Sequence, residues 1–388
     1  MRSGPDVLVM VLAGGAGSRL EPLTDHRAKP ALPFGGMYRL IDITLSNVAH
    51  SGFDDVWVIE QYLPHALNDH LANGRPWDLD RTHGGLQILP PFEGERQDGF
   101  AGGNADAIAK QLPFLRDFAP DVVVVVSADH VYRLDLAEVV SSHLDRRPEL
   151  TIVTTERAAG DDPSRFAWVS VGDDGTVTDF QYKPDDPKGT AICAEVFVFD
   201  GLSLLRRLGH LVVDADDDSG EADGGQPLGD YGERLLPELV DDGAALAFTM
   251  QGYWRDVGTI GAYHAAHMDL LGDDPVITLD DPSWPMLTGS ITGGPAIVGA
   301  SARVVNSLLS PGSRVAGEVV DSVLGRNVVI EDGARVRGSV VLDDAIIRSG
   351  VTVERSIVDV GVELSHLSGR SITETADEDS GIRVYTTD

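Results

Sequence analysis

Three glycines and two basic residues near the beginning of the chain have the types and spacing to bind phosphate groups. Gly14, Gly15 and Gly17 directly follow a run of apolar residues. Glycines let the backbone turn sharply and approach a ligand closely, so such a turn can direct several N–H groups at one phosphate. Arg19 and Lys29 follow soon after, and both can reach back toward the turn. The sequence therefore predicts an anion site at the end of its first strand.

The glycines alone do not identify the anion. Their spacing is not the G-x-G-x-x-G of dinucleotide-binding proteins, and the G-K-[ST] ending of the NTPase phosphate loop is missing. An ordinary glycine-containing turn remains an alternative interpretation at this point.

A longer string of residues narrows the interpretation. Residues 12–24 read L-A-G-G-x-G-x-R-L-x-P-L-T, and R-A-K-P-A follows at 27–31. Residues 34–42 read F-G-G-M-Y-R-L-I-D, with L-S-N at 45–47. Together these motifs resemble the sugar-1-phosphate nucleotidylyltransferases, and among them the glucose-1-phosphate adenylyltransferase (ADP-glucose pyrophosphorylase) family. The resemblance extends over roughly residues 5–365.

The resemblance implies that ATP and glucose 1-phosphate are converted to ADP-glucose and pyrophosphate, as in glycogen or α-glucan biosynthesis. It implies catalytic roles for Arg19, at the β- and γ-phosphates, and for Lys29, at the α-phosphate. Residues 103–107 resemble a Gly-Thr-Ala-Asp-Ala motif beside the adenine, although an ordinary helix capped by Asn104 is the alternative. The implied nucleotide-binding residues are Leu12, Ala13, Gly14, Gly15, Gly17, Gly103, Asn104 and Asp106.

Two aspartates match the positions that hold Mg²⁺ in the family. Asp129 follows the very apolar run 122–127, and carboxyl ends of such strands are where open α/β sheets bind ligands. Asp256 lies in Tyr-Trp-Arg-Asp-Val-Gly-Thr at 253–259. Oxygen ligands from distant segments, completed by phosphates, suit Mg²⁺. Asp129 could instead cap a helix, but Asp135 is better placed for that, and His130 is interpreted as a structural residue.

The sugar half of the site departs from the family pattern. The resemblance assigns the sugar phosphate to Lys183 and the sugar pocket to Tyr182, Ala167, Cys193 and Glu195. The family has Glu-Lys-Pro, Ser-Met-Gly, Phe-Gly-Val and Trp-Tyr-Arg-Gly-Thr where this chain has Tyr-Lys-Pro, Cys-Ala-Glu, Phe-Ala-Trp and Phe-Ala-Gly-Gly-Asn. One hypothesis is a modified sugar such as glucosamine 1-phosphate, with Glu195 meeting its ammonium group. The alternative is that Glu195 points to solvent.

The elements that must position these residues form an α/β pattern over residues 1–272, the expected nucleotidyltransferase domain. We expect a Rossmann-like domain with a mixed, mostly parallel sheet. Its predicted strands are 7–12, 56–59, 86–89, 122–127, 151–155 and 192–199, with a hairpin over 167–171 and 176–182. Its predicted helices are 38–50, 64–73, 104–116, 229–240 and 259–271. Residues 93–104 and 214–225 are predicted to be a mobile loop over the site and a solvated acidic loop.

Residues 273–370 follow a different pattern. Serines 307, 322, 339 and 356 each precede two apolar residues, at intervals of 15, 17 and 17 residues. Short strands at this period favour a parallel β-helix of hexapeptide repeats over a small β-sandwich. The resemblance implies a left-handed helix and a homo-oligomer, a tetramer, formed through it. Residues 371–388 are predicted to be a polar C-terminal tail that frays.

Composition limits the partners. A net charge of −32 makes nucleic acids and anionic membranes poor partners. The single cysteine, Cys193, excludes an internal disulfide and fits a reducing cytoplasm. We expect no membrane span, because no apolar run is long enough. Two further interpretations remain: a non-catalytic regulatory subunit of the same family, and an acyltransferase carried by the β-helix.

Overall fold

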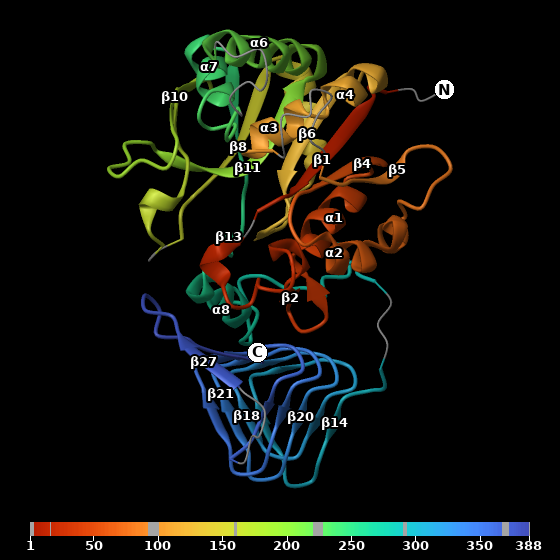
Figure 1. The fold of residues 1–388 in the computed structure, drawn as a ribbon, viewed down its shortest axis with the longest axis vertical. Helices are drawn as coiled ribbons and strands as arrows, with labels where there is room; N and C mark the ends of the chain where they lie inside the picture. The colour runs from red at the N-terminus through yellow and green to blue at the C-terminus, as the bar shows by residue number, and fades with distance from the viewer. Residues whose placement is uncertain are drawn as a thin grey trace.

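A nine-stranded mixed sheet forms the centre of the first half of the chain (Figure 1). The computed structural model describes residues 4–15, 17–91, 101–158, 161–219, 228–289, 293–366 and 372–387. Strand β1 (Val7–Ala13) pairs in parallel with β4 (Asp55–Glu60) and β6 (Val122–Ser127), and β5 (Gly85–Leu89) extends the sheet beyond β4. The predicted mixed, mostly parallel sheet is confirmed.

The other side of the sheet contains the antiparallel strands. The long strand β11 (Ala191–Asp200) runs antiparallel to β6 and to β8 (Leu150–Thr155). Strand β12 (Ala245–Thr249) pairs in parallel with β8. The predicted hairpin is present as β9 (Trp168–Val171) and β10 (Val177–Gln181).

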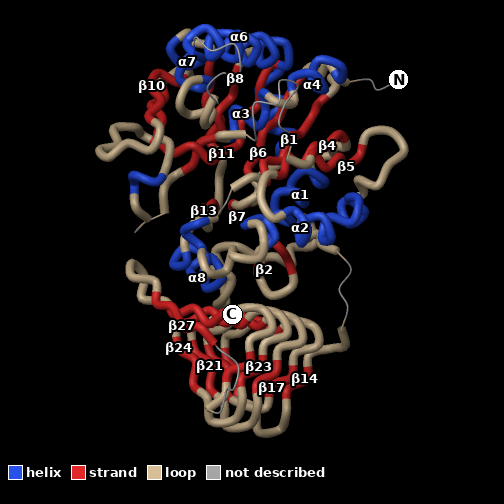
Figure 2. The backbone as a smooth tube through the Cα atoms, in the orientation of Figure 1, coloured by secondary structure: helices blue, strands red, loops and turns tan. Residues whose placement is uncertain are grey.

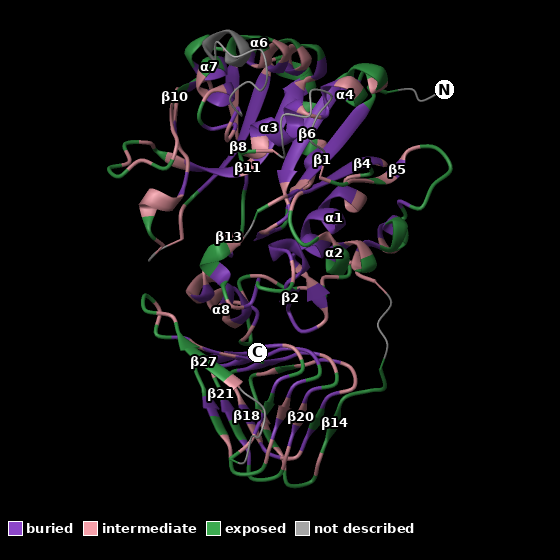
Figure 3. Ribbon diagram, viewed as in Figure 1, coloured by how far each residue is buried: buried purple, intermediate pink, exposed green. Residues whose placement is uncertain are grey.

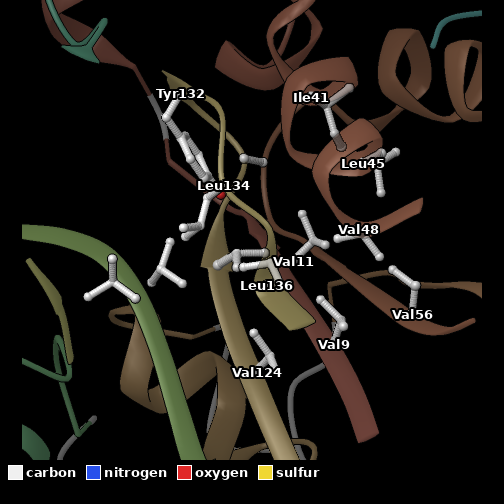
Figure 4. Packing of buried hydrophobic residues seen from close by; sticks show 14 of the residues in the cluster. Val9, Val11, Ile41, Leu45, Val48, Val56, Val124, Tyr132, Leu134 and Leu136 are labelled. Carbon is white, nitrogen blue, oxygen red and sulfur yellow. The ribbon is translucent and has the colours of Figure 1, made fainter. Parts of the chain in front are cut away.

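Side chains along β1 point alternately to the two faces of this sheet, and helices bury them on both faces. Val9 and Val11 face helices α1 (Leu40–His50), α2 (Pro64–Leu71) and α5 (Leu136–Arg146). Figure 4 shows them beside Ile41, Leu45 and Val48 of α1. Leu8 and Met10 face helices α3 (Asn104–Ala109), α4 (Leu112–Phe118), α6 (Gly201–Ser219) and α7 (Leu235–Asp241). A strand buried on both faces reads as a continuous apolar run, which is why these strands could be recognised (Figure 3).

Several predicted elements differ from the structure. The helix expected over 229–240 begins only at Leu235, as α7, and the first two residues of the helix expected over 38–50 form strand β3 (Tyr38–Arg39). The helix expected over 104–116 is two helices, α3 and α4, because Lys110 and Gln111 separate them. Asn104 is not the cap of α3: Gly103 takes that position, and Asn104 is the first helical residue. The segment expected to be an acidic loop begins as the last turn of α6, which continues to Ser219. Most of the loop predicted over 93–104 lies outside the described residues.

Two pairs of short strands lie outside the main sheet, and the first of them joins segments that are distant in the sequence. Strand β7 (His130–Tyr132) pairs antiparallel with β13 (Trp254–Asp256), with His130 opposite Asp256. A second pair is formed by β2 (Pro33–Phe34) and β3 (Tyr38–Arg39). Helix α8 (Ile260–Met268) follows β13 and is capped by the Thr259 side chain.

The second half of the chain is a stack of parallel coils. Short strands form three parallel ladders, which Figure 2 shows as successive turns below the α/β domain. The ladders are β14 (Ile297–Val298), β17 (Arg314–Val315), β20 (Val329–Ile330), β23 (Ile346–Ile347) and β26 (Glu363–Leu364); β15 (Arg303–Val305), β18 (Glu318–Val320), β21 (Arg335–Arg337) and β24 (Thr352–Glu354); and β16 (Leu308–Leu309), β19 (Val323–Leu324), β22 (Val340–Val341) and β25 (Ser356–Val358). The predicted parallel β-helix is confirmed.

The serine repeat has a structural cause. The hydroxyls of Ser307, Ser322 and Ser339 each accept a hydrogen bond from the backbone N–H of the serine in the next coil, at 3.1, 3.2 and 3.1 Å. The repeated serines therefore stack directly above one another and fix the register of the coils.

The C-terminal segment is paired, and the expectation that it frays is wrong. Strand β27 (Ile372–Ala376) forms a hairpin with β28 (Arg383–Thr387), which pairs in parallel with β25. Ile382 and Val384 are buried in the same apolar cluster as Leu20 and Val257 of the α/β domain. The segment thus covers the last coil and packs against the first domain.

No helix among the described residues combines the length and apolar character that crossing a membrane requires.

Candidate active site

A cavity of about 330 Å³ opens where β1, β4 and β6 end. Leu12, Ile59 and Ser127 mark the ends of these strands on its wall. Carboxyl ends of neighbouring parallel strands meet at one edge of a sheet, so this is the place where an open α/β sheet binds ligands. The predicted site residues that line the cavity are Leu12, Gly14, Gly15, Arg19, Lys29, Gly103, Asn104, Asp129, Tyr182, Lys183, Glu195 and Asp256.

Lys29 is the centre of this cavity's charge arrangement. Its Nζ lies 2.6 Å from Asp129 Oδ2 and 3.4 Å from Asp256 Oδ1. Lys29 is only 6% exposed. Burial alone would lower the pKa of Lys29, but the two carboxylates outweigh burial and raise it. Lys29 is therefore a permanently charged group fixed between two aspartates.

The two aspartates are held ionised. Burial would raise the pKa of Asp129, but Lys29, His130 and a hydrogen bond from Ser127 Oγ bring it well below its usual range. The same opposition of burial and Lys29 lowers the pKa of Asp256. Both carboxylates are thus available as anions at any pH near neutrality.

The pairing of β7 with β13 brings these aspartates together. Asp129 immediately precedes β7, and Asp256 ends β13 opposite His130. Gly258 permits this arrangement, because a Cβ there would lie 2.9 Å from Asp256 Oδ1 and 2.9 Å from Arg165 Nη2. A two-strand pairing between segments more than a hundred residues apart therefore assembles the acidic centre.

The acidic centre has donors that suit a divalent cation. One ligand atom from each of Asp129, His130 and Asp256 lies within 4.8 Å of the others. Two carboxylates on the wall of a cavity offer hard oxygen ligands and leave room for phosphate oxygens, which is the coordination Mg²⁺ prefers. The residues present therefore fit Mg²⁺, which Asp129 and Asp256 would hold.

The glycine turn forms the phosphate side of the cavity. A Cβ on Gly15 would meet nothing within 4 Å, so Gly15 borders open space on the cavity wall. A Cβ on Gly14 would instead lie 2.5 Å from Gln61 Oε1. Arg19 is exposed on the same wall, directly after the turn. The backbone of this turn can therefore approach an anion closely.

The opposite wall contains a connected polar group. Lys183 Nζ donates to Tyr182 Oη at 2.7 Å, and Tyr182 Oη donates to Asp230 Oδ2 at 2.5 Å. Asp230 Oδ1 accepts from the backbone N–H of Asn104, and the Asn104 side chain accepts from that of Tyr231. These bonds connect the start of α3 to the segment before α7, so they fix the two segments of this wall relative to each other.

Five predicted site residues do not line the cavity: Ala13, Gly17, Asp106, Ala167 and Cys193. Cys193 is buried in the apolar cluster beneath the sheet, because strand alternation directs it there, and its N–H donates to the carbonyl of Ala167. Ala13 is buried on the opposite face of the sheet. The Gly17 carbonyl accepts from Thr24 Oγ1, and Asp106 accepts from the backbone N–H of Gly102. Gly17 and Asp106 therefore shape the loops beside the cavity.

Other residues of the cavity were not predicted. Arg165 Nη2 lies 2.7 Å from Asp256 Oδ2, and His130, interpreted as structural, lies 3.6 Å from Asp129 Oδ1. Gln61, Tyr62, Asp230 and Tyr231 also line the wall. The Gly-Asp-Tyr-Gly at 229–232 could have drawn attention to Asp230, since it places a carboxylate between glycines.

Comparison with known proteins agrees with this geometry. Residues 8–272 match the model of a family described as nucleotidyl transferase. The chain belongs to the nucleotidyl transferase family. Residues 296–387 match a second family, described as GlmU-like, C-terminal hexapeptide.

Curated relatives of this nucleotidyl transferase carry a more specific description. A glucose-1-phosphate adenylyltransferase of Clostridioides difficile (strain 630) is 36% identical over 334 residues, which cover 85% of this chain and 83% of the relative. Proteins of the same description from Thermotoga neapolitana and Clostridium acetobutylicum are 39% and 38% identical, over 86% and 84% of this chain and 76% and 84% of the relatives. The resemblance recognised from the motifs is confirmed: the chain is a sugar nucleotidyltransferase enzyme related to these proteins.

Proposed function

We propose that this enzyme transfers the adenylyl group of ATP to glucose 1-phosphate, forming ADP-glucose and pyrophosphate for α-glucan synthesis. The observation that carries this proposal is the convergence of Lys29, Asp129 and Asp256 in one cavity beside the glycine turn. Similarity to glucose-1-phosphate adenylyltransferases over most of the chain supports the choice of substrates.

In this reaction an oxygen of the sugar phosphate attacks the α-phosphorus of ATP, and the bond to the β-phosphate breaks as pyrophosphate leaves. The attacking oxygen is already an anion, so the enzyme needs no general base. It needs to bring two anions together in line and to neutralise their charge. Unscreened repulsion between them would cost several kcal/mol.

The cations of the cavity fit these requirements. We assign Arg19 to the β- and γ-phosphates, because it follows the turn that approaches the anion most closely. Lys29 takes the α-phosphate, where charge increases during transfer. Lys183, on the opposite wall, takes the phosphate of the sugar. Mg²⁺ held by Asp129 and Asp256 would neutralise phosphate charge and favour departure of pyrophosphate.

Glucosamine 1-phosphate is a second candidate acceptor with the same chemistry. Glu195 supports it, because this carboxylate lines the cavity and is close enough to Lys183 for their charges to interact. A carboxylate beside the sugar could pair with an ammonium group. A non-catalytic regulatory role receives less support, because Arg19, Lys29, Asp129, Lys183 and Asp256 are all present on the cavity wall.

The test is a matrix of nucleotides against sugar phosphates, with release of pyrophosphate as the readout. ATP, GTP, CTP, UTP and dTTP are each paired with glucose, glucosamine, N-acetylglucosamine and mannose 1-phosphate, in the presence of MgCl₂. The proposal expects the highest kcat/KM for ATP with glucose 1-phosphate. A preference for another base or sugar would replace the proposed substrates, and a folded protein that releases no pyrophosphate from any pair would support the regulatory role.

We further propose a cytoplasmic homotetramer that assembles through the β-helix. Apolar side chains exposed on its first coils, including Ile297, Val298 and Val305, support this surface as the contact. Light scattering of the purified chain would give four times the chain mass of 41.4 kDa. A monomeric mass at micromolar concentration would contradict the assembly.

A further inference from the structure

Glu195 has a backbone conformation that its residue type disfavours. Its φ is 54°, in the left-handed region that glycine adopts freely and other residues avoid. The register of β11 against β8 shifts between Cys193 and Phe197, and the N–H of Glu195 donates to Cys193 Sγ at 3.3 Å instead of to a neighbouring strand. Strained positions of this kind concentrate at functional sites, because the surrounding structure must maintain them.

The bulge directs the Glu195 side chain into the cavity. Glu195 lines the wall together with Lys183 and Tyr231. Burial raises the pKa of Glu195, and Asp129 and Asp256 raise it further, whereas His130 and Lys183 lower it. Burial and the nearby Glu195 carboxylate raise the pKa of Tyr231, whose hydroxyl is a neutral donor toward it. The carboxylate therefore faces the same space as the groups assigned to the reacting phosphates.

Adenylyl transfer as described above does not use this carboxylate. A carboxylate repels phosphates, so it would weaken binding of ATP or of a sugar phosphate unless it met hydrogen-bond donors on the ligand. The nearby Asp230 is held by neighbouring groups, because each of its oxygens accepts a hydrogen bond, one from Tyr182 Oη and one from the Asn104 N–H. Glu195 has no such pair of bonds among the residues that the structure describes and accepts from Tyr231, so most of its acceptor sites remain for a ligand.

We propose that Glu195 is a specificity-determining residue that accepts hydrogen bonds from donors on the sugar ring of the acceptor substrate. This inference rests on the proposed function, since it assumes that the acceptor is a sugar 1-phosphate. The donors are ring hydroxyls, as in glucose, or an ammonium group, as in glucosamine. Both present N–H or O–H groups to the same carboxylate, and the experiment distinguishes them.

The test compares Glu195→Gly with the unchanged enzyme. Glycine adopts a φ of 54° without strain, so the melting temperature should not fall, and a loss of activity cannot be attributed to unfolding. We expect kcat/KM for the sugar 1-phosphate to fall about 10- to 100-fold, the range for loss of a hydrogen bond to a charged group. KM for ATP should stay within about twofold. Unchanged kcat/KM for every sugar phosphate that the enzyme uses would overturn the inference.

Glu195→Gln identifies the donor. Glutamine keeps an acceptor oxygen but loses the charge. If ring hydroxyls are the partners, kcat/KM for glucose 1-phosphate should fall less in this variant than in Glu195→Gly. If an ammonium group is the partner, kcat/KM for glucosamine 1-phosphate should fall equally in the two variants. The unchanged enzyme should then have a higher kcat/KM for glucosamine 1-phosphate than for glucose 1-phosphate.

Calorimetric binding separates this inference from the proposed function. Glucose 1-phosphate and glucosamine 1-phosphate are titrated into each form in the presence of MgCl₂, without a requirement for turnover. Weaker binding to Glu195→Gly supports the inference even if no pyrophosphate is released, whereas failure of turnover alone counts against the proposed reaction. Equal affinity of both forms for both sugar phosphates would overturn the inference.

Discussion

Lys29 lies on the cavity wall where, in the proposed reaction, it contacts the reacting phosphates. It is buried, it contacts two aspartates, and those contacts keep all three groups charged. Replacement of one member leaves an uncompensated charge in a cavity with little water, where charge is costly. Lys29 is therefore both a structural counter-ion and, in the proposed reaction, the group at the α-phosphate.

The first prediction concerns Lys29→Gln. We expect kcat for pyrophosphate release to fall about 100- to 1,000-fold, the range for loss of one group that stabilises transition-state charge. The melting temperature should also fall, because Asp129 and Asp256 then face each other without Lys29. Added MgCl₂ should restore more of the melting temperature in this variant than in the unchanged enzyme, because the cation replaces the lost charge.

Lys188→Gln is the matched control, since Lys188 is exposed and does not line the cavity. It should change neither kcat nor the melting temperature. A Lys29→Gln enzyme with kcat within threefold of the original would show that Lys29 has no role at the α-phosphate.

The second prediction concerns the glycine turn. Gly15→Ala adds a Cβ that meets no protein atom within 4 Å and lies on the cavity wall. The fold should be unaffected, but the methyl group should occupy space that a phosphate needs, so KM for ATP should rise at least about tenfold. Gly294→Ala, equally uncrowded but remote from the cavity, is the control. Equal KM values for ATP in all three proteins would place the phosphates elsewhere.

At the scale of residues, the sequence motifs predicted the cations and aspartates of the cavity, but they did not predict the residues that contact these groups. Lys29, Asp129 and Asp256 stand in strings of several characteristic residues, so their positions could be inferred. His130 meets Asp256 because β7 pairs with β13, and a pairing of three-residue strands leaves no periodic pattern in the sequence. Arg165 reaches Asp256 from a separate short helix, Pro163–Arg165, which no motif marks. Cys193 was misplaced because alternation along β11 buries it on the same face as Phe197 and Phe199.

At the scale of elements, β4 ends in a buried acid that makes stability depend on pH. Glu60 is 1% exposed, and neither carboxylate oxygen has a hydrogen-bond partner among the described residues. Burial raises the pKa of Glu60 to about 7, although Asn68 lowers it in part. The folded state thus holds this proton more tightly than the unfolded chain does. The stability that Glu60 contributes is present below about pH 4 and is lost as the pH rises to about 7.

The third prediction follows from this loss of stability with rising pH. Glu60→Gln removes the titration, so the decrease in unfolding free energy between pH 5 and pH 8 should shrink by about 2 kcal/mol. Urea denaturation at both pH values measures it. Glu138→Gln on the exposed face of α5 should leave the decrease unchanged. If Glu60→Gln keeps the full pH dependence, Glu60 is already ionised in the folded protein.

Elements with a strong period were predicted more accurately than their ends. The valine run of β6 and the serine repeat of the β-helix each follow one spacing, because one burial environment repeats along them. The break between α3 and α4 does not interrupt the apolar pattern of the sequence, because apolar side chains of both helices are buried in the same cluster. The acidic residues that end α6 suggested a loop, yet they continue the helix to Ser219.

At the scale of the molecule, the β-helix supports the segment that follows the glycine turn. Leu20 and Leu32 share one buried cluster with Ile357, Ile382 and Val384 of the second half of the chain. Arg27 lies 2.9 Å from Asp359, and Arg39 lies 3.3 Å from Asp343, across the same boundary. The two halves therefore pack as one structure around residues 20–39, close to the cavity.

The fourth prediction tests this support. Ile382→Ala should lower the unfolding free energy by about 2–4 kcal/mol, because it leaves a cavity in a buried cluster. Thr375→Ala in the same hairpin is exposed and should change it by less than about 0.5 kcal/mol. Thermal denaturation of both variants measures the effect. Equal melting temperatures would show that the C-terminal hairpin does not stabilise the domain boundary.

The most direct test of the central claim is the product balance with and without the acidic centre. The purified enzyme is incubated with ATP, glucose 1-phosphate and MgCl₂, and pyrophosphate and ADP-glucose are quantified for the original protein and for Asp256→Asn. We predict equal amounts of the two products from the original enzyme, and a rate at least about 1,000-fold lower from Asp256→Asn with its circular dichroism spectrum retained. Comparable rates from the two proteins would contradict the claim that Lys29, Asp129 and Asp256 together perform nucleotidyl transfer.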